Sequence, residues 1–196
     1  MSRRLLALAV SALALLVSAG CADDVSPAAR IGDVKISNDE LLDEVAEWVG
    51  NPAAIDPATV ASTTPGSYPL ELVRQLLQQR LDFELHRQEF DELGLEVDDD
   101  LRQQALTVLF GDPAAADDAF AAFSEEFAAS FVDDVARQIA VQNELGEEGY
   151  AAWRTAAYGE TDIEVNPRYG TWDAATGQII APSGPVQPAT FPVATP

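Results

Sequence analysis

The sequence predicts a mostly helical domain with short strands before its first helix and after its last one. Apolar residues recur at three- and four-residue spacing over most of the region between residues 38 and 157, which is the period of an amphipathic helix. Alternation typical of strands is confined to residues 30–37 and 163–180. A chain of 196 residues has about the length of one domain once a leader is set aside.

The N-terminus has the pattern of a secretory signal peptide. Arg3 and Arg4 precede an apolar run from Leu5 to Val17, and small residues follow up to Cys21. This run is shorter than the roughly 20 residues that a membrane-spanning helix needs. We therefore expect residues 1–20 to be a signal peptide, with cleavage between Gly20 and Cys21.

The segment Ser18-Ala19-Gly20-Cys21 resembles the lipobox of bacterial lipoproteins, although Ser18 stands where leucine is usual. In those proteins the cysteine becomes the first mature residue and carries the lipid. The resemblance implies lipidation of Cys21, a tether over residues 21–29, and anchoring to the outer face of the bacterial cell membrane. The alternative is an ordinary signal peptide whose cleavage region happens to contain the chain's single cysteine.

The charge balance excludes a nucleic-acid-binding surface. The chain has 33 acidic and 11 basic residues and a formal net charge of −22, whereas nucleic acids require a basic face. Anionic lipid headgroups are repelled as well, so attachment to a membrane falls to the lipid on Cys21. The acidity either keeps the protein soluble outside the cell or attracts basic polypeptides, and composition alone favours the first interpretation.

The first elements have clear local signals. Ile31, Val34 and Ile36 with a bend at Gly32-Asp33 predict a strand pair over residues 30–37. Ser37 and Glu40 have the capping-box spacing, which predicts a helix that Gly50 and Pro52 end. Residues 51–69 are rich in Pro, Ala, Ser and Thr and predict a long flexible loop.

Two further helices follow the loop. A leucine stripe predicts a helix over residues 70–93, which Gly94 and Leu95 end in a Schellman-type turn. Asp98 is placed to cap the next helix, which is expected to reach Phe110.

A helix is also expected from residue 114 to about 145, on the strength of a repeated phenylalanine pattern. Another restarts near Glu147 and runs to Ala157. Residues 163–165 predict a strand and residues 169–180 a hairpin. The proline-rich tail over 182–196 is expected to be disordered.

The order of these elements, with the segment Leu93-Gly94-Leu95-Glu96-Val97-Asp98 between two helices, resembles the N-terminal chaperone domain of the SurA family. Trigger factor and PrsA-type foldases share this domain. Residues 163–173 resemble the closing segment of actinobacterial SurA-like lipoproteins. The resemblance covers residues 28–181. It implies a SurA-like helical domain over residues 30–181, with a small antiparallel sheet that joins strands at 31–36 to strands at 163–180.

The resemblance also implies binding of unfolded or partly folded exported polypeptides. Many relatives insert a parvulin-type prolyl isomerase domain, but residues 145–161 leave no room for one. Parvulin sites tend to use paired histidines, and the chain has one histidine. We therefore expect no enzyme activity, no catalytic residue and no cofactor.

The remaining polar candidates favour structural roles. His86 is a single histidine on a predicted helix, and such residues are more often structural than catalytic or metal-binding. The run Asp98–Asp100 lacks the ligand spacing of a calcium loop, so helix capping is the better interpretation. The adjacent pairs Asp117-Asp118 and Asp133-Asp134 diverge on a helix and form no acid/base dyad. We expect no metal site.

The phenylalanine stripe is the speculative binding site, formed by Phe120, Phe123, Phe127 and Phe131. It is either core packing, which is the commoner case, or part of an exposed cradle for apolar segments. The leading functional hypothesis is a lipid-anchored holding chaperone. The alternatives are a scaffolding lipoprotein that docks one envelope protein and, less favoured, a peptidyl-prolyl isomerase.

Overall fold

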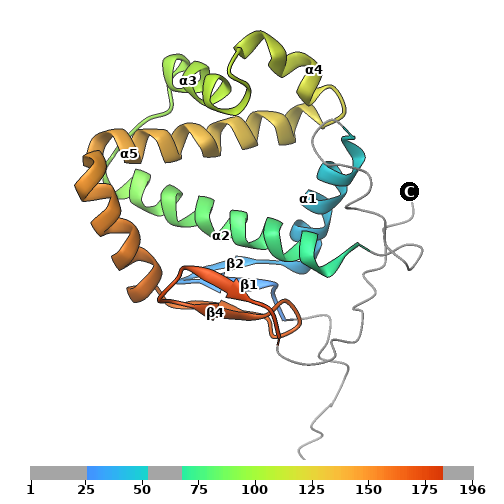
Figure 1. Ribbon diagram of the computed structural model, residues 1–196, viewed down its shortest axis with the longest axis vertical. Coiled ribbons are helices and arrows are strands. Elements are labelled where there is room, and N and C mark those ends of the chain that lie inside the picture. The colour runs from blue at the N-terminus through green and yellow to red at the C-terminus, as the bar shows by residue number, and fades with distance from the viewer. Residues whose placement is uncertain (1–25, 53–67, 183–196) are drawn as a thin grey trace, which may run out of the picture.

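The computed structural model describes residues 26–52 and 68–182 (Figure 1). The signal peptide, Cys21, most of the loop predicted at 51–69 and the tail after Pro182 lie outside these residues, so those expectations stay predictions.

The predicted fold class is confirmed, since helices dominate and the strands at both ends of the domain are short. The helices are α1 (Asn38–Gly50), α2 (Leu70–Glu92), α3 (Asp99–Phe110), α4 (Ala116–Phe120) and α5 (Glu125–Glu160). The strands are β1 (Ala29–Ile31), β2 (Val34–Ile36), β3 (Ile163–Val165), β4 (Thr171–Asp173) and β5 (Gln178–Ile180).

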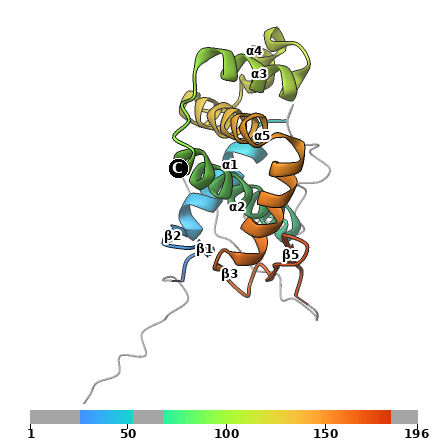
Figure 2. The same cartoon turned by 90° about the vertical axis from the view of Figure 1, so that its left-hand side faces the viewer.

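β3 joins the N-terminal strands in one antiparallel sheet, as the family resemblance implied, whereas the expectation that residues 171–180 join the same sheet is wrong. β1 is the central strand of the order β2-β1-β3, and Ala29 stands opposite Ile36 on one side and Val165 on the other. β4 and β5 pair with each other in a separate hairpin. The strands lie beneath α2 in Figure 1, and Figure 2 shows the second half of α5 descending to them.

The predicted helix ends are confirmed where a local signal marked them. The Ser37–Glu40 capping box is present in both directions, and Asp98 caps α3 by accepting a hydrogen bond from Leu101 N. At the end of α2, Leu95 N donates to Phe90 O and Gly94 N to Asp91 O, both at 3.1 Å, which is the Schellman pattern. Gly94 supplies the positive φ of +65° that this turn requires.

The single helix predicted over residues 114–145 is wrong. A short 3₁₀ turn (Pro113–Ala115) leads into α4, the chain turns at residues 121–124, and α5 starts afresh. The physical cause is a cap, because Ser124 Oγ accepts the Phe127 N–H at 3.2 Å and so satisfies a donor that a helix start leaves free. The predicted restart near Glu147 is confirmed by Gly146, whose φ of +65° breaks the helical geometry of α5. The helix then continues past the predicted end at Ala157.

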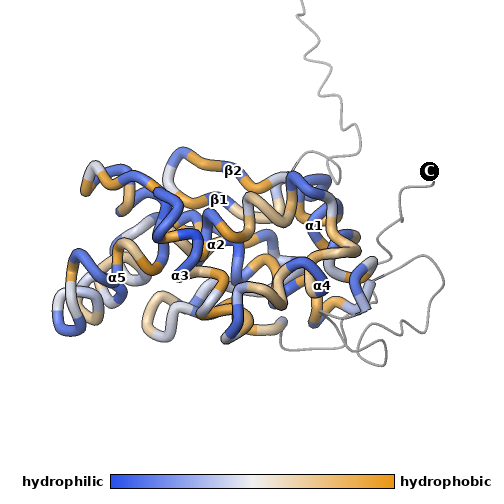
Figure 3. The backbone as a smooth tube through the Cα atoms, turned by 90° about the horizontal axis from the view of Figure 1, so that it is seen from above, coloured by the Kyte–Doolittle hydropathy of each residue, from blue (hydrophilic) through white to orange (hydrophobic). Residues whose placement is uncertain are grey.

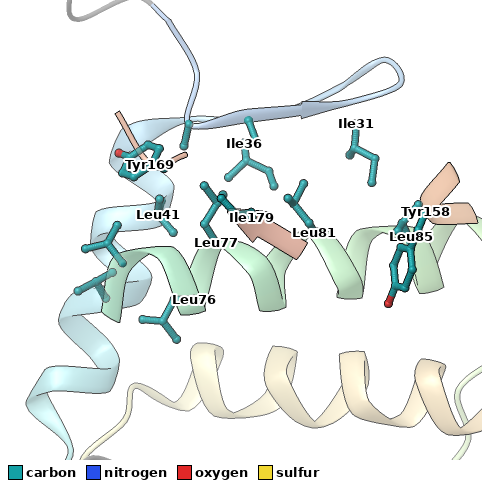
Figure 4. Close-up of a cluster of buried hydrophobic side chains, with 14 residues drawn as sticks. Ile31, Ile36, Leu41, Leu76, Leu77, Leu81, Leu85, Tyr158, Tyr169 and Ile179 are labelled. Atoms are coloured by element: carbon teal, nitrogen blue, oxygen red, sulfur yellow. The ribbon is translucent and has the colours of Figure 1, made fainter. Parts of the chain in front are cut away.

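The core is organised around α2, which is buried on two sides. One side packs against the strands, α1 and the hairpin, with Leu77 and Leu81 at its centre (Figure 4). The other side uses Phe83 to join a second cluster with α3 and α5. Phe90 contributes to a third, smaller cluster with Val141. None of the described helices has the length and apolar character needed to cross a membrane.

Candidate functional site

The four phenylalanines do gather in one place, but they do not share one helix. Phe120 ends α4, Phe123 lies in the turn, and Phe127 and Phe131 belong to α5. Trp48 of α1 is their common neighbour, with ring centroids 5.2 Å from Phe123, 6.0 Å from Phe127 and 5.3 Å from Phe131. All three contacts are edge-to-face, which is a favoured aromatic geometry. α1 and α4 lie at the same end of the molecule (Figure 1, Figure 3).

The aromatic group has a buried part and an accessible part. Phe131 is 9% exposed and packs in the second cluster, where Phe120 joins it from the side. Phe123 and Phe127 are half-buried, and neither is among the side chains that pack into that cluster. Phe131 and Phe120 therefore pack in the core, whereas Phe123 and Phe127 form a half-buried aromatic rim outside this cluster.

Phe127 also lines a cleft of about 390 Å³ between α1, α2 and the start of α5. Ile36 and Leu41 contribute further apolar surface. Ser124 and Glu47 both line the cleft, and a hydrogen bond from Ser124 N to Glu47 Oε2 at 2.9 Å joins the N-cap of α5 to α1. We call this the α1–α5 cleft.

The charged residues of the α1–α5 cleft are mostly acidic. Arg80 of α2 is the one cation among the lining residues. Five acidic residues line the same cleft, namely Glu40, Asp43, Glu44, Glu47 and Glu126. The cleft therefore combines an apolar surface with a negative potential, a pairing that suits a ligand with both apolar and basic groups.

Glu44 is the most perturbed carboxyl group of the cleft. Burial raises its pKa to about 7, against the opposing effect of the positive charge on Arg80, and the negative charge of Asp134 raises it further. Among the described residues, none donates a hydrogen bond to Glu44. By contrast, hydrogen bonds from the backbone and side chain of Ser37 lower the pKa of Glu40. Glu40 is thus committed to its cap, and Glu44 is available to a donor that enters the cleft.

A network of ion pairs with buried carboxylates and half-buried arginines lies between α2 and α5. Asp134 is 4% exposed and accepts hydrogen bonds from Arg87 at 3.0 Å and Arg137 at 2.8 Å. Arg87 also contacts Glu84 at 2.8 Å. Asp133 points elsewhere, to Arg102 of α3 at 2.8 Å, so the prediction that the two carboxylates diverge is confirmed.

His86 is a satisfied core residue, as the sequence indicated. It is 1% exposed, with Nδ1 2.7 Å from the carbonyl oxygen of Asp82 and Nε2 2.9 Å from the Tyr150 hydroxyl. Nδ1 donates to the carbonyl, since a carbonyl oxygen only accepts, and in the neutral ring that burial favours Nε2 accepts from the Tyr150 hydroxyl. Burial lowers the pKa of His86 accordingly.

The sequence analysis missed Trp48, Glu44 and Arg80 as members of the site. No local pattern marks these residues, because they come from α1 and α2 and only tertiary packing brings them to the site. The described residues contain no group of three or more His, Cys, Asp or Glu side chains placed to hold a metal ion.

Comparison with known proteins adds no relative: no family model matches the chain, and no curated protein and no solved structure matches it.

Proposed function

We propose that this protein is a lipid-anchored, extracytoplasmic chaperone that holds unfolded or partly folded exported polypeptides without catalysis. The observation that carries the proposal is the aromatic rim of Phe123 and Phe127, which is only partly buried and lies outside the three core clusters, beside the α1–α5 cleft. A folded protein normally buries such groups unless they bind something. The lipobox at Cys21 and the SurA-like order of the elements support the same location and role.

The mechanism is non-covalent. An exposed apolar segment of an unfolded chain gains free energy by leaving water against Phe123 and Phe127. The strong negative charge of the protein, −22 over the whole chain, then keeps the complexes apart, because net charge of one sign opposes association. Holding a segment in this way limits aggregation and requires no catalytic group.

A scaffolding lipoprotein that docks one envelope protein is the second candidate. The size of the α1–α5 cleft favours it, because about 390 Å³ is near the lower end of the range for small-molecule pockets and accommodates only a few side chains. Such a protein would bind one partner with defined contacts and would leave the aggregation of other polypeptides unchanged.

The test is aggregation of an unfolded exported protein, followed by light scattering with and without the mature protein. We expect suppression by the wild type and loss of suppression in the double variant Phe123→Ser/Phe127→Ser. The matched control is Val108→Ser, which removes an apolar side chain that is 70% exposed on α3, outside the cleft. Scattering that is unchanged at stoichiometric excess of the wild type would overturn the proposal.

A further inference from the structure

We propose that the α1–α5 cleft selects polypeptide segments in which a lysine or arginine neighbours an apolar side chain, and that Glu44 receives the cation. This inference rests on the proposed function, because it takes a polypeptide as the ligand. It goes further by naming the chemistry of the segment and the residue that recognises it.

The first support is the arrangement of charge along α1. Glu40, Glu44 and Glu47 follow one another at helical spacing and therefore share a face, and Asp43 lies beside them. Glu126 adds a carboxylate from α5, so the cleft is acidic on two sides. A basic side chain entering between them meets an attractive potential from both walls.

The second support is the state of Glu44 itself. Its side chain is half-buried in the cleft, none of the described residues donates a hydrogen bond to it, and the positive charge of Arg80 offsets the effect of burial only in part. A polar group in this condition carries a desolvation cost that a hydrogen-bonding partner removes. An ammonium or guanidinium group of a ligand supplies both the donor and the opposite charge.

The third support distinguishes a polypeptide from a simple cation. The carboxylates are spread along a helix face and do not converge as metal ligands do, in keeping with the absence of any metal-binding group among the residues described. Leu41, Ile36 and Phe127 line the same cleft. A ligand that uses the whole cleft therefore has an apolar group next to its cation, as a peptide does.

Binding should be linked to the release of a proton. Glu44 faces Glu40, Asp43 and Glu47 on its own helix, Arg80 on α2, and Glu126 and Asp134 on α5. Near neutral pH, Glu44 holds its proton part of the time, since its pKa is about 7. A cation in the cleft favours the ionised carboxylate and displaces that proton. Affinity for a basic segment should therefore rise with pH.

The experiment measures the affinity of two fluorescent peptides of equal length for the full mature protein, by anisotropy, at pH 5.5 and pH 8. One peptide carries arginine beside leucine and phenylalanine, and the other carries glutamine in place of arginine. We expect the arginine peptide to bind about tenfold more tightly at pH 8 than at pH 5.5, which corresponds to a pKa fall of about one unit on binding. The glutamine peptide should bind more weakly, without this pH dependence.

Glu44→Gln should abolish the pH dependence of binding the arginine peptide, whereas Glu144→Gln, an exposed change elsewhere on α5, should preserve it. Equal affinity for the two peptides, or pH dependence that survives in Glu44→Gln, would overturn the inference. Free Ca²⁺ that displaces the arginine peptide at micromolar concentration would also overturn it, in favour of a metal site. Aggregation assays on the same variants separate this inference from the proposed function. If the protein suppresses aggregation but does not prefer the arginine peptide, only this inference is contradicted. If it binds the arginine peptide selectively but does not suppress aggregation, only the holding function is contradicted.

Discussion

The strand end and the α1–α5 end of the molecule are built in different ways. At the strand end, polar groups fix the packing: Gln78 of α2 donates to Gly177 O at 3.0 Å and accepts from Ile179 N at 2.7 Å. Tyr169 is fully buried and donates to Asn38 Oδ1 at 2.7 Å. At the α1–α5 end, hydrogen bonds from Ser124 N to Glu47 and from Asn51 Nδ2 to Ala119 O also join the elements, but the Trp48 Nε1 donor is buried without an acceptor and its ring packs against three phenylalanine rings.

This difference in packing assigns the stability of the fold to the strand end and ligand binding to the α1–α5 end. Hydrogen bonds between specific partners define one arrangement and resist rearrangement, which suits the end that joins the N-terminal and C-terminal strands. Aromatic contacts are less directional and leave Phe123 and Phe127 half-buried. We infer that the strand end holds the fold together and that the α1–α5 end is free to accept a ligand.

The largest loss of stability is expected in the ion network that ties α5 to α2, on which both ends depend. Asp134→Ala removes two charge-assisted hydrogen bonds, from Arg87 and Arg137, and each such bond contributes about 1.5–3 kcal/mol. Asp133→Ala is the matched control, because its ion pair with Arg102 is near the surface, where solvent screens the charges and such pairs contribute little. Urea denaturation measures the unfolding free energy of both variants. Equal losses in the two variants would contradict the importance of the Asp134 network for stability.

Gly177→Ala should cause the next largest loss of stability, and its effect should be confined to the strand end. A Cβ atom at Gly177 would lie 2.4 Å from a ring carbon of Tyr158, so the hairpin and α5 must move apart, at a cost of about 1–3 kcal/mol for overpacking. Gly32→Ala separates this clash from backbone strain, because Gly32 also has a positive φ but no atom within 4 Å of the new Cβ. If the two variants lose equal stability, the close packing at Gly177 is not what fixes the hairpin.

These contrasts also mark what the sequence could predict. Helix starts at Ser37 and Asp98 and the turn at Gly94 depend on residues within one or two turns, so they were predicted correctly. The break at residues 121–124 was missed because the phenylalanine spacing continues across it, and periodicity does not register the Ser124 cap. The cleft was missed because Glu44, Arg80 and Phe127 come from three helices, and only tertiary packing reveals that they meet.

The smallest expected effect is a pH-dependent one at the α1–α5 end. The pKa of Glu44 is raised to about 7 in the folded protein from an ordinary 4.5, so this group favours folding below pH 4.5 and loses that contribution as pH rises to 7. Glu44→Gln should therefore gain stability relative to the wild type as pH rises from 4.5 to 8. The quantity to measure is the difference in unfolding free energy between Glu44→Gln and the wild type at each pH. The pKa of His86 is lowered, so this residue raises stability as pH rises, but it does so equally in both proteins. If the difference in unfolding free energy stays constant with pH, the raised pKa of Glu44 is contradicted.

Hydrogen–deuterium exchange of the full mature protein with an unfolded exported polypeptide tests the division between the two ends most directly. The account predicts added protection in α1 and in the first turns of α5, around Trp48, Glu44 and Phe127, with no change in β1, β3 or the β4–β5 hairpin. Added protection at the strands, with α1 and the start of α5 unchanged, would contradict it.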